Sequence, residues 1–384
     1  MITQFAAAPG VIDLAWGHPD PALLDPGIVA VAARDALARW GPDALGYGAA
    51  HGPEPTLDWL TRHLAALDGR APEAGELIVV AGASQGLEIA CSQLGAPGDA
   101  VLVPVPSYHL AIRIFQDHPF RLVPVPADGD GVLPDAAEAA ARQVIAEGGR
   151  PRFLYLVPVC ANPTGVSLPL DRRRAIVEVA ERTGLTILED DVYRELTLDG
   201  PPPPSLWSLG APGSVLRLGS VSKTLAPGVR LGWLTGDRAT IGRIARSGLL
   251  DSGGGLQHLT ALVVTELATS GVYAQNLSRI RDGLTARRAA LADGLRSHAP
   301  ETSFRMPEGG YFLWLRLPDG ADPRALLPAA TAAGVTWIPG ERFAAGTEAG
   351  AAHARLAFSR NAPDALAEAA RRIGTLLTPG RSGA

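Results

Sequence analysis

Apolar stretches of strand length alternate with helix-like segments through the middle of the chain. Residues 76–80 and 100–103 are short apolar runs, and a segment with helical spacing follows each of them. Further strand candidates are residues 121–125, 153–157, 185–188, 215–218 and 231–235. Strands this apolar are typically buried on both faces, so the alternation predicts a mostly parallel sheet with helices on either side. We therefore expect an α/β fold.

The pattern changes in the last third of the chain. Two long helical segments are predicted between residues 257 and 298, with a break at Ser270-Gly271. Strand candidates at 311–317 and 355–358 follow them, which is typical of a separate, smaller α+β domain. The predicted division is an N-terminal segment (1–43) that contributes to the small domain and a pocket, a large domain (44–270) and a small domain (271–384).

One helix of the large domain has clear predicted ends. Apolar residues recur at helical spacing between 171 and 183, with Asp171 at the start and Gly184 directly after the end. Acidic residues cap helix N-termini and glycine commonly ends helices. We expect Asp171 to cap this helix and Gly184 to end it.

Charge and composition exclude several classes of partner. The net charge of −5 at pH 7 has no basic tail or stripe, which argues against nucleic acid or an anionic membrane as the main partner. No run approaches the roughly 18 apolar residues of a membrane span, and the first residues lack a signal-peptide pattern. Cys91 and Cys160 match no metal-binding spacing, so no metal site is predicted. A cytoplasmic protein that acts on small molecules is expected.

Lys223 is the only lysine in a chain with 34 lysine and arginine residues. A lysine amine can lose its proton when desolvated and can then act as a nucleophile, whereas guanidinium stays charged. A lone exposed lysine is the alternative. The surroundings favour chemistry, because Ser220, Ser222 and Arg230 lie within seven residues of Lys223 in the sequence.

Residues 220–233 (SVSKTLAPGVRLGW) resemble the Ser-x-Ser-Lys motif of class I/II aminotransferases, the pyridoxal-phosphate enzymes of fold type I. The chain most resembles the branch with 2-aminoadipate and aromatic amino-acid aminotransferases, from about Gly17 to Phe358. The resemblance implies that Lys223 holds pyridoxal phosphate as an aldimine and moves the substrate's α-proton. It further implies that Arg230, Ser220 and Ser222 bind the phosphate.

The segment Glu189-Asp190-Asp191-Val192-Tyr193 follows a predicted strand, at the edge where α/β sites gather. By the family's Asp-x-x-Tyr pattern, Asp190 would pair with the pyridine nitrogen and Tyr193 would hydrogen-bond the ring's phenolic oxygen. Asn162, in the family's Asn-Pro-x-Gly signature, would contact the same oxygen and the substrate carboxylate. A helix-capping acidic cluster and a plain Asn-Pro turn are the alternatives.

The residues Gly82-Ala83-Ser84-Gln85-Gly86 open a predicted helix after the first core strand. Free backbone N–H groups and the helix dipole favour a phosphate there, and Ser84 and Gln85 match the family's phosphate-binding pair. An ordinary helix cap would explain the serine equally well. Tyr108 stands where the family stacks an aromatic ring on the pyridine face, although a core tyrosine is the alternative.

Three further residues are assigned by resemblance. Arg355, in His353-Ala354-Arg355, corresponds to the arginine that grips the substrate α-carboxylate, with an edge-strand arginine as the alternative. Gly17 resembles part of the stretch that lines the substrate pocket. Tyr47, in Gly46-Tyr47-Gly48, resembles the tyrosine that reaches the neighbouring subunit's phosphate, although the tripeptide is also a good turn. A homodimer with shared active sites is therefore expected.

The leading hypothesis is an aminotransferase that moves an amino group between an L-amino acid and a 2-oxo acid through a Lys223 aldimine. A lyase, decarboxylase, oxidase or carbon–carbon bond-forming enzyme on the same fold needs the same residues and stays open. Two departures from the branch, Ala161 and Asn276, leave biosynthetic specialisation open. A transcriptional regulator with an aminotransferase-like domain is the third hypothesis. It is disfavoured because the pattern already begins near Gly17 and leaves no room for a DNA-binding domain.

Overall fold

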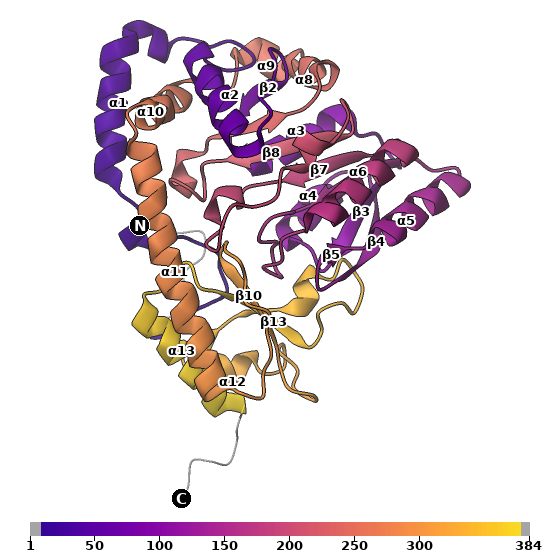
Figure 1. Ribbon diagram of the computed structural model, residues 1–384, viewed down its shortest axis with the longest axis vertical. Coiled ribbons are helices and arrows are strands. Elements are labelled where there is room, and N and C mark those ends of the chain that lie inside the picture. Colours follow the sequence, from indigo (N-terminus) through magenta and orange to yellow (C-terminus); the bar gives the residue numbers. More distant parts are fainter. Residues whose placement is uncertain (1–8, 378–384) are drawn as a thin grey trace, which may run out of the picture.

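An eight-stranded sheet forms the centre of the structure, a computed structural model that describes residues 9–377 (Figure 1). The strand order is β2-β9-β8-β7-β6-β3-β4-β5. The five strands from β8 to β4 are parallel, whereas β9 is antiparallel to both of its neighbours and β5 is antiparallel to β4. The predicted mostly parallel sheet is confirmed. The strands are β2 (Leu77–Val80), β3 (Ala100–Val105), β4 (Arg121–Asp128), β5 (Gly131–Val132), β6 (Pro151–Leu156), β7 (Thr186–Asp190), β8 (Val215–Ser220) and β9 (Gly232–Thr235).

Helices cover both faces of this sheet because successive side chains of each strand point to opposite faces. In β7, Leu188 packs in the core under α3, α4 and α8, whereas Ile187 packs in the core under α5, α6 and α7. These helices are α3 (Ala83–Leu94), α4 (His109–Gln116), α5 (Pro134–Ala146), α6 (Leu170–Thr183), α7 (Leu206–Leu209) and α8 (Arg238–Ala245). Each face of the sheet thus has its own apolar core.

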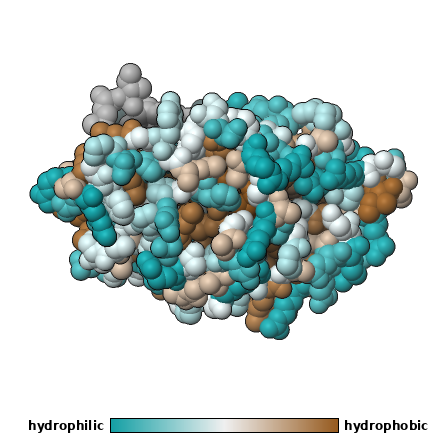
Figure 2. Space-filling model, turned by 90° about the horizontal axis from the view of Figure 1, so that it is seen from above, coloured by the Kyte–Doolittle hydropathy of each residue, from teal (hydrophilic) through white to brown (hydrophobic). Residues whose placement is uncertain are grey.

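A third cluster of helices packs at the β2–β9 end of the sheet. It contains α1 (Pro26–Trp40), α2 (Glu54–Asp68) and α10 (His258–Thr269), with the short α9 (Gly248–Gly253) nearby. Short 3-10 helices are η1 (Pro21–Leu23), η2 (Gly41–Leu45), η3 (Arg194–Leu196), η4 (Pro227–Val229) and η5 (Gly340–Phe343). On the face in Figure 2, apolar side chains form separate groups among hydrophilic ones.

The smaller α+β region is reached through the long helix α11 (Val272–His298), which runs down one side of the molecule (Figure 1). Its antiparallel sheet has the order β10-β13-β12, and α13 (Pro363–Leu377) packs along α11. The remaining elements are β1 (Ile12–Asp13), β10 (Phe312–Arg316), β11 (Val335–Thr336), β12 (Ile338–Pro339), β13 (His353–Ala357) and α12 (Leu327–Ala332). The predicted break between two long helices at Ser270-Gly271 is confirmed.

The N-terminal segment contributes to both regions. β1 pairs in parallel with β11 of the small region, whereas α1 packs against α10 beside the large sheet. The predicted domain limits stay a prediction, and their outer ends, residues 1–8 and 378–384, lie outside the described residues.

The predicted cap of α6 is wrong. Its N-cap is Pro169, without a side-chain hydrogen bond, and Asp171 lies one residue inside the helix. An acidic residue in the first turn still interacts favourably with the helix dipole, which explains the sequence signal. Gly184 ends the helix in the left-handed conformation, with φ 71°, as predicted.

Candidate active site

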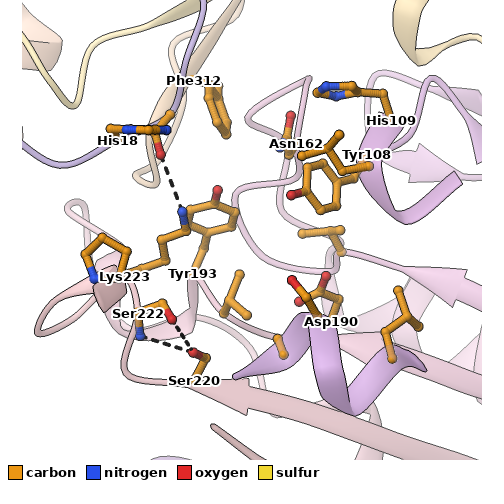
Figure 3. Close-up of a pocket in the computed structure, with 18 of the residues that line it drawn as sticks. His18, Tyr108, His109, Asn162, Asp190, Tyr193, Ser220, Ser222, Lys223 and Phe312 are labelled. Carbon is orange, nitrogen blue, oxygen red and sulfur yellow. Dashed lines mark hydrogen bonds between the residues drawn. The ribbon is translucent and has the colours of Figure 1, made fainter. Parts of the chain in front are cut away.

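A pocket lies where the parallel strands end and the small region approaches them. Most of the residues that the sequence singled out line it together (Figure 3). These residues are Gly17, Ser84, Tyr108, Asn162, Asp190, Tyr193, Ser220, Ser222, Lys223, Arg230 and Arg355. They come from segments more than 300 residues apart, so the fold brings together what the sequence keeps separate.

Asp190 is the last residue of β7 and points into this pocket. It is 7% exposed, and its Oδ2 accepts a hydrogen bond of 2.6 Å from the Tyr155 hydroxyl. Its Oδ1 is buried and has no hydrogen-bond partner among the residues that the structure describes. Burial raises the pKa of Asp190 to about 6, although the Tyr155 hydrogen bond and the charge of Lys223 lower it. One carboxylate oxygen is therefore fixed, and the other is available to a ligand.

Lys223 follows β8 and extends its amine into the pocket. Its Nζ donates a hydrogen bond of 3.4 Å to the backbone oxygen of Gly17 and lies 5.2 Å from the centre of the Tyr311 ring. Burial lowers the pKa of Lys223 to about 8, and the charge of Arg355 adds to this, whereas the charge of Asp190 opposes it. A lysine with this pKa has a reactive neutral fraction near neutral pH.

The N-terminus of α3 and the Lys223 loop form a cradle of hydrogen-bond donors. Arg230 has a left-handed backbone, with φ 53°, and its Nη2 donates to the Ala81 oxygen at 2.9 Å. Its Nη1 lies 3.3 Å from Ser222 Oγ. Gly82 has φ 83°, and a Cβ there would lie 2.5 Å from Arg230 Nη2. Glycine is favoured here because this φ is strained for other residues and because a Cβ would displace the guanidinium of Arg230. The guanidinium and the serine hydroxyls thus lie beside a helix N-terminus.

Arg355 of β13 closes the pocket from the small region. It is 2% exposed, and its Nη1 donates to Asn162 Oδ1 at 2.8 Å. Its guanidinium lies 4.1 Å from the Phe312 ring centre, and its Nε is buried without a partner in the described part of the chain. Burial lowers the pKa of Arg355 to about 10. No carboxylate side chain of the described residues forms an ion pair with it, which suits an anionic ligand.

Two predicted residues do not place their side chains in the pocket. The side-chain amide oxygen of Gln85, Oε1, accepts a hydrogen bond of 2.7 Å from the Ala81 N–H and so caps the turn before α3. Tyr47 is 89% exposed on the surface of the single chain. The side chain of Gln85 thus has a structural partner, whereas the hydroxyl of Tyr47 faces outward.

Sequence reasoning missed several residues that shape the pocket. Tyr155 contacts Asp190, and Tyr311 lies under Lys223. Trp16, His109 and Phe312 line the pocket, and burial lowers the pKa of His109 to about 3, so it stays neutral. His109 and Trp16 could have been predicted as pocket residues, because they are the sequence neighbours of Tyr108 and Gly17, which belong to recognised motifs. Tyr155 lies inside an apolar strand and had none.

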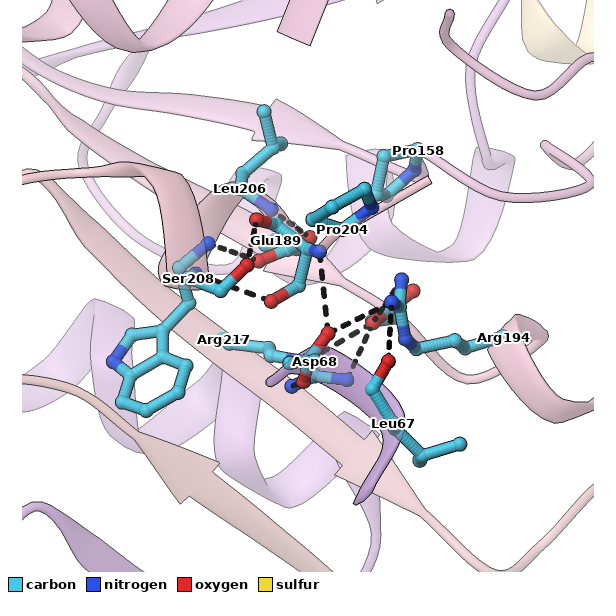
Figure 4. A network of polar contacts seen from close by, with 12 residues as sticks. Leu67, Asp68, Pro158, Glu189, Arg194, Pro204, Leu206, Ser208 and Arg217 are labelled. Atoms are coloured by element: carbon cyan, nitrogen blue, oxygen red, sulfur yellow. Dashed lines mark hydrogen bonds and ion pairs between the residues drawn. The ribbon is translucent and has the colours of Figure 1, made fainter. Parts of the chain in front are cut away.

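A buried polar network joins Glu189, Asp68, Arg194 and Arg217 (Figure 4). It lies on the face of the sheet opposite to Asp190, because successive side chains of a strand point to opposite faces. Arg217 pairs with Asp191 at 2.8 Å and with Asp68 at 2.5 Å, and Arg194 pairs with Asp68 at 2.7 Å. Glu189 accepts two backbone hydrogen bonds, of 2.8 and 2.9 Å, from the start of α7. The network joins α2, β7 and β8 and so fixes the end of the strand that carries Asp190.

These features fit pyridoxal phosphate. The unpartnered Asp190 Oδ1 suits a protonated ring nitrogen, and Lys223 suits the aldehyde carbon. The Gly82–Arg230 cradle suits a phosphate dianion. Within the described residues no cluster of side chains could hold a metal ion, and no helix is long and apolar enough to cross a membrane.

Comparison with known proteins agrees with this geometry. The family model for aminotransferase class I and II matches residues 10–373. A 2-aminoadipate transaminase of Thermus thermophilus is 32% identical over 383 residues, which cover 98% of this chain and 92% of that protein. An HTH-type transcriptional regulator of Bacillus subtilis is 32% identical over 295 residues, and this match covers 76% of the chain but 60% of the regulator.

A solved structure shows the same architecture. The α-aminoadipate aminotransferase of Thermus thermophilus, complexed with N-(5'-phosphopyridoxyl)-L-leucine, superposes with a TM-score of 0.84 at 30% identity. The superposition covers 96% of this chain and 92% of that one. The resemblance inferred from the motifs is confirmed over nearly the whole length. The chain belongs to the aminotransferase class I and II family, as a transaminase of amino and 2-oxo acids with pyridoxal phosphate as its cofactor.

Proposed function

We propose that Lys223 binds the cofactor covalently and then moves the substrate proton during transamination. The observation that carries this proposal is the meeting of the chain's only lysine with Asp190 and Arg355 in one pocket. When bound, pyridoxal phosphate supplies an electron sink for the negative charge left at the substrate α-carbon. The neutral amine of Lys223, favoured by its pKa of about 8, would accept the proton from the substrate α-carbon and donate a proton to the former aldehyde carbon of the cofactor.

The other pocket residues hold cofactor and substrate in place. Asp190 would pair with the protonated ring nitrogen through Oδ1, and Tyr108 would pack against the ring. Tyr193 and Asn162 would hydrogen-bond the ring's phenolic oxygen. The phosphate would be held by Ser84, Ser220, Ser222, Arg230 and the backbone N–H of Gln85. Arg355, Asn162 and the Gly17 segment bind the substrate carboxylate, for which the free Nε of Arg355 is suited.

We further propose a homodimer in the cytoplasm, with Tyr47 donating to the partner's phosphate. Tyr47 and Leu45 are 89% and 71% exposed, and other exposed apolar side chains lie on α1, α9 and α10. These are Val31, Leu37, Leu249 and Leu259. The elements α1, η2 and α10 pack against one another, and η2 ends two residues before Tyr47. A two-fold interface over it would cover apolar area and bring Tyr47 to a second chain.

The test uses holoenzyme and a panel of single amino acids without any 2-oxo acid. A transaminase converts about one equivalent of amino acid per site to its 2-oxo acid and then stops, because the amino group stays on the cofactor. Addition of a 2-oxo acid should restart the reaction. A lyase, decarboxylase or oxidase would turn over repeatedly with one substrate, and mass analysis would show its products.

Borohydride reduction and peptide mapping identify the residue that carries the cofactor. The label should be on Lys223, the only lysine. A label confined to the chain's α-amine, or repeated turnover with an amino acid alone, would contradict the proposal.

A further inference from the structure

Tyr155 lies on β6, the strand next to β7, with its side chain on the pocket face of the sheet. It is 0% exposed, and its ring packs edge-on against Phe115 of α4 at 5.4 Å between centres. The register aligns Tyr155 with Leu188, two residues before Asp190, so the two side chains lie on the same face of the sheet. This packing fixes the direction in which the Tyr155 hydroxyl points.

The Tyr155 hydroxyl is directed at Asp190. The distance from the hydroxyl to Asp190 Oδ2 is 2.6 Å, which is typical of a strong hydrogen bond to a charged acceptor. A phenol donates a single proton, and here that proton goes to the carboxylate. Asp190 Oδ1 lacks a partner among residues 9–377, so the carboxylate is anchored at one oxygen and open at the other.

Other groups also act on Asp190, and one of them is the backbone N–H of Val192, which lowers its pKa. Tyr108 and Tyr193 face it across the pocket, and Lys223 faces it from the loop after β8. Asp191, which follows Asp190 in the chain, adds a like charge that raises the pKa of Asp190. The Arg217 guanidinium is engaged with Asp191 and Asp68 on the other side of β7. Tyr155 is thus the side chain that donates a hydrogen bond directly to the buried carboxylate.

We propose that Tyr155 is a positioning residue that orients Asp190 toward the cofactor ring and stabilises its ionised form. This inference rests on the proposed role of Asp190. Without the hydroxyl, the buried Asp190 would lose its side-chain hydrogen-bond donor, and the carboxyl would hold its proton to higher pH. A protonated Asp190 is a poor partner for a protonated ring nitrogen. Loss of the hydroxyl should therefore weaken cofactor binding on the acid side.

The test measures the affinity of pyridoxamine 5'-phosphate for the cofactor-free protein between pH 6 and pH 8. This probe has the ring and phosphate of the cofactor but cannot condense with Lys223, so lysine titration does not dominate the curve. The phosphate of the probe titrates in the same way whichever variant it binds, so we interpret only the differences in affinity between variants. Loss of a charged hydrogen bond should raise the pKa of Asp190 by about one unit.

With a starting pKa of about 6, Tyr155→Phe should bind the probe about fivefold more weakly than the wild type at pH 6 and about equally at pH 8. Turnover should show a lower kcat with KM little changed. Tyr273→Phe is the matched control, because Tyr273 is also buried and its hydroxyl contacts Glu195 and Thr224 rather than Asp190. Its binding curve should keep the wild-type midpoint.

The Asp190→Asn background separates this inference from the proposed function. If Asp190 is the titrating group, Asp190→Asn removes the part of the acid limb that Asp190 causes and leaves only the part set by the phosphate, and adding Tyr155→Phe then changes nothing. An unchanged acid limb in Asp190→Asn would overturn the role of Asp190 and the inference together. An acid limb that is reduced in Asp190→Asn but unshifted in Tyr155→Phe would overturn the inference alone. A variant that is partly misfolded to the same extent across pH 6–8 loses affinity by the same factor at every pH, so the midpoint of its binding curve is not moved.

Discussion

In the cofactor-free protein, the Lys223 amine should titrate near pH 8. Burial removes water from the ammonium, and the nearby guanidinium of Arg355 disfavours the charge, whereas the Asp190 carboxylate favours it. With a pKa of about 8, about one amine in ten is neutral at pH 7, compared with about one in three thousand for an ordinary lysine. The pocket therefore increases the reactive fraction by a factor on the order of a few hundred.

The assay follows from the sequence. Trace labelling with acetic anhydride modifies neutral amines, and this chain offers only Lys223 and the α-amine. The rate of labelling of the Lys223 peptide, measured by mass across pH 6–11, gives a midpoint that does not depend on how accessible the amine is. The α-amine in the same sample serves as an internal reference.

Two variants test the cause of the shift. Asp190→Asn removes the carboxylate that favours the ammonium, so it should lower the midpoint for Lys223. Arg355→Met removes a repelling charge, so it should raise the midpoint. Neither change should move the midpoint of the α-amine. A wild-type midpoint near 10, or a rise in Asp190→Asn, would refute the reasoning that burial and these two charges set the pKa.

Three further predictions concern the cofactor site. Asp190→Asn should lower kcat by orders of magnitude, whereas Asp191→Asn should chiefly lower the free energy of unfolding in urea, since Asp191 pairs with Arg217 behind the sheet. A loss of kcat in Asp191→Asn but not in Asp190→Asn would show that Asp191, rather than Asp190, acts in the pocket. Gly82→Ala should speed cofactor release in dialysis by about tenfold, because the added Cβ would displace Arg230 and the φ of 83° is strained for alanine. If Gly82→Ala retains the cofactor as long as the wild type does, the proposed role of the cradle in phosphate binding is wrong. If Tyr47 acts across a dimer interface, mixing Tyr47→Phe with Lys223→Ala subunits creates one intact site per mixed dimer, so activity per intact lysine should rise. Activity equal to the average of the two parent variants, or a fully active monomer in light scattering, would argue against a role of Tyr47 across the interface.

Much of the fold could be predicted because its signals are local. A buried parallel strand is an apolar run, and a helix of this class ends at a glycine such as Gly184, so both features can be recognised within a few residues. The Asp171 cap was wrong because an acidic residue is favourable both at the cap and in the first turn. The antiparallel pairing of β2 with β9 was not predicted, because strand direction depends on connections rather than on composition.

In the candidate site, too, residues in local motifs could be predicted, and residues outside such motifs could not. Residues in short motifs, such as Asn162 and Lys223, were found because their neighbours in sequence also surround the pocket. Gln85 shows the limit of that reasoning, since its side chain turns back to Ala81. Tyr155 could not be found, because nothing near it in the sequence distinguishes it from a core aromatic residue. The ion pair between Arg217 and Asp68 could not be predicted either, because the two residues are 149 positions apart in the sequence.

The acidic run from Glu189 to Asp191 shows why the missing information matters for function. Three consecutive buried carboxylates would repel one another strongly if they shared one environment. The strand instead turns Glu189 and Asp191 to the back, where α7 backbone N–H groups bind the first and Arg217 pairs with the second. Burial and the charge of Asp191 still raise the pKa of Glu189, whereas the charges of Arg217 and Arg173 and the backbone hydrogen bond from Trp207 lower it. Asp190 alone turns to the front, where no arginine pairs with it in the described structure and the Tyr155 hydroxyl is its side-chain hydrogen-bond donor. Its charge therefore remains available for a protonated ring nitrogen, which is why a shift of one residue along this strand would remove the site's function.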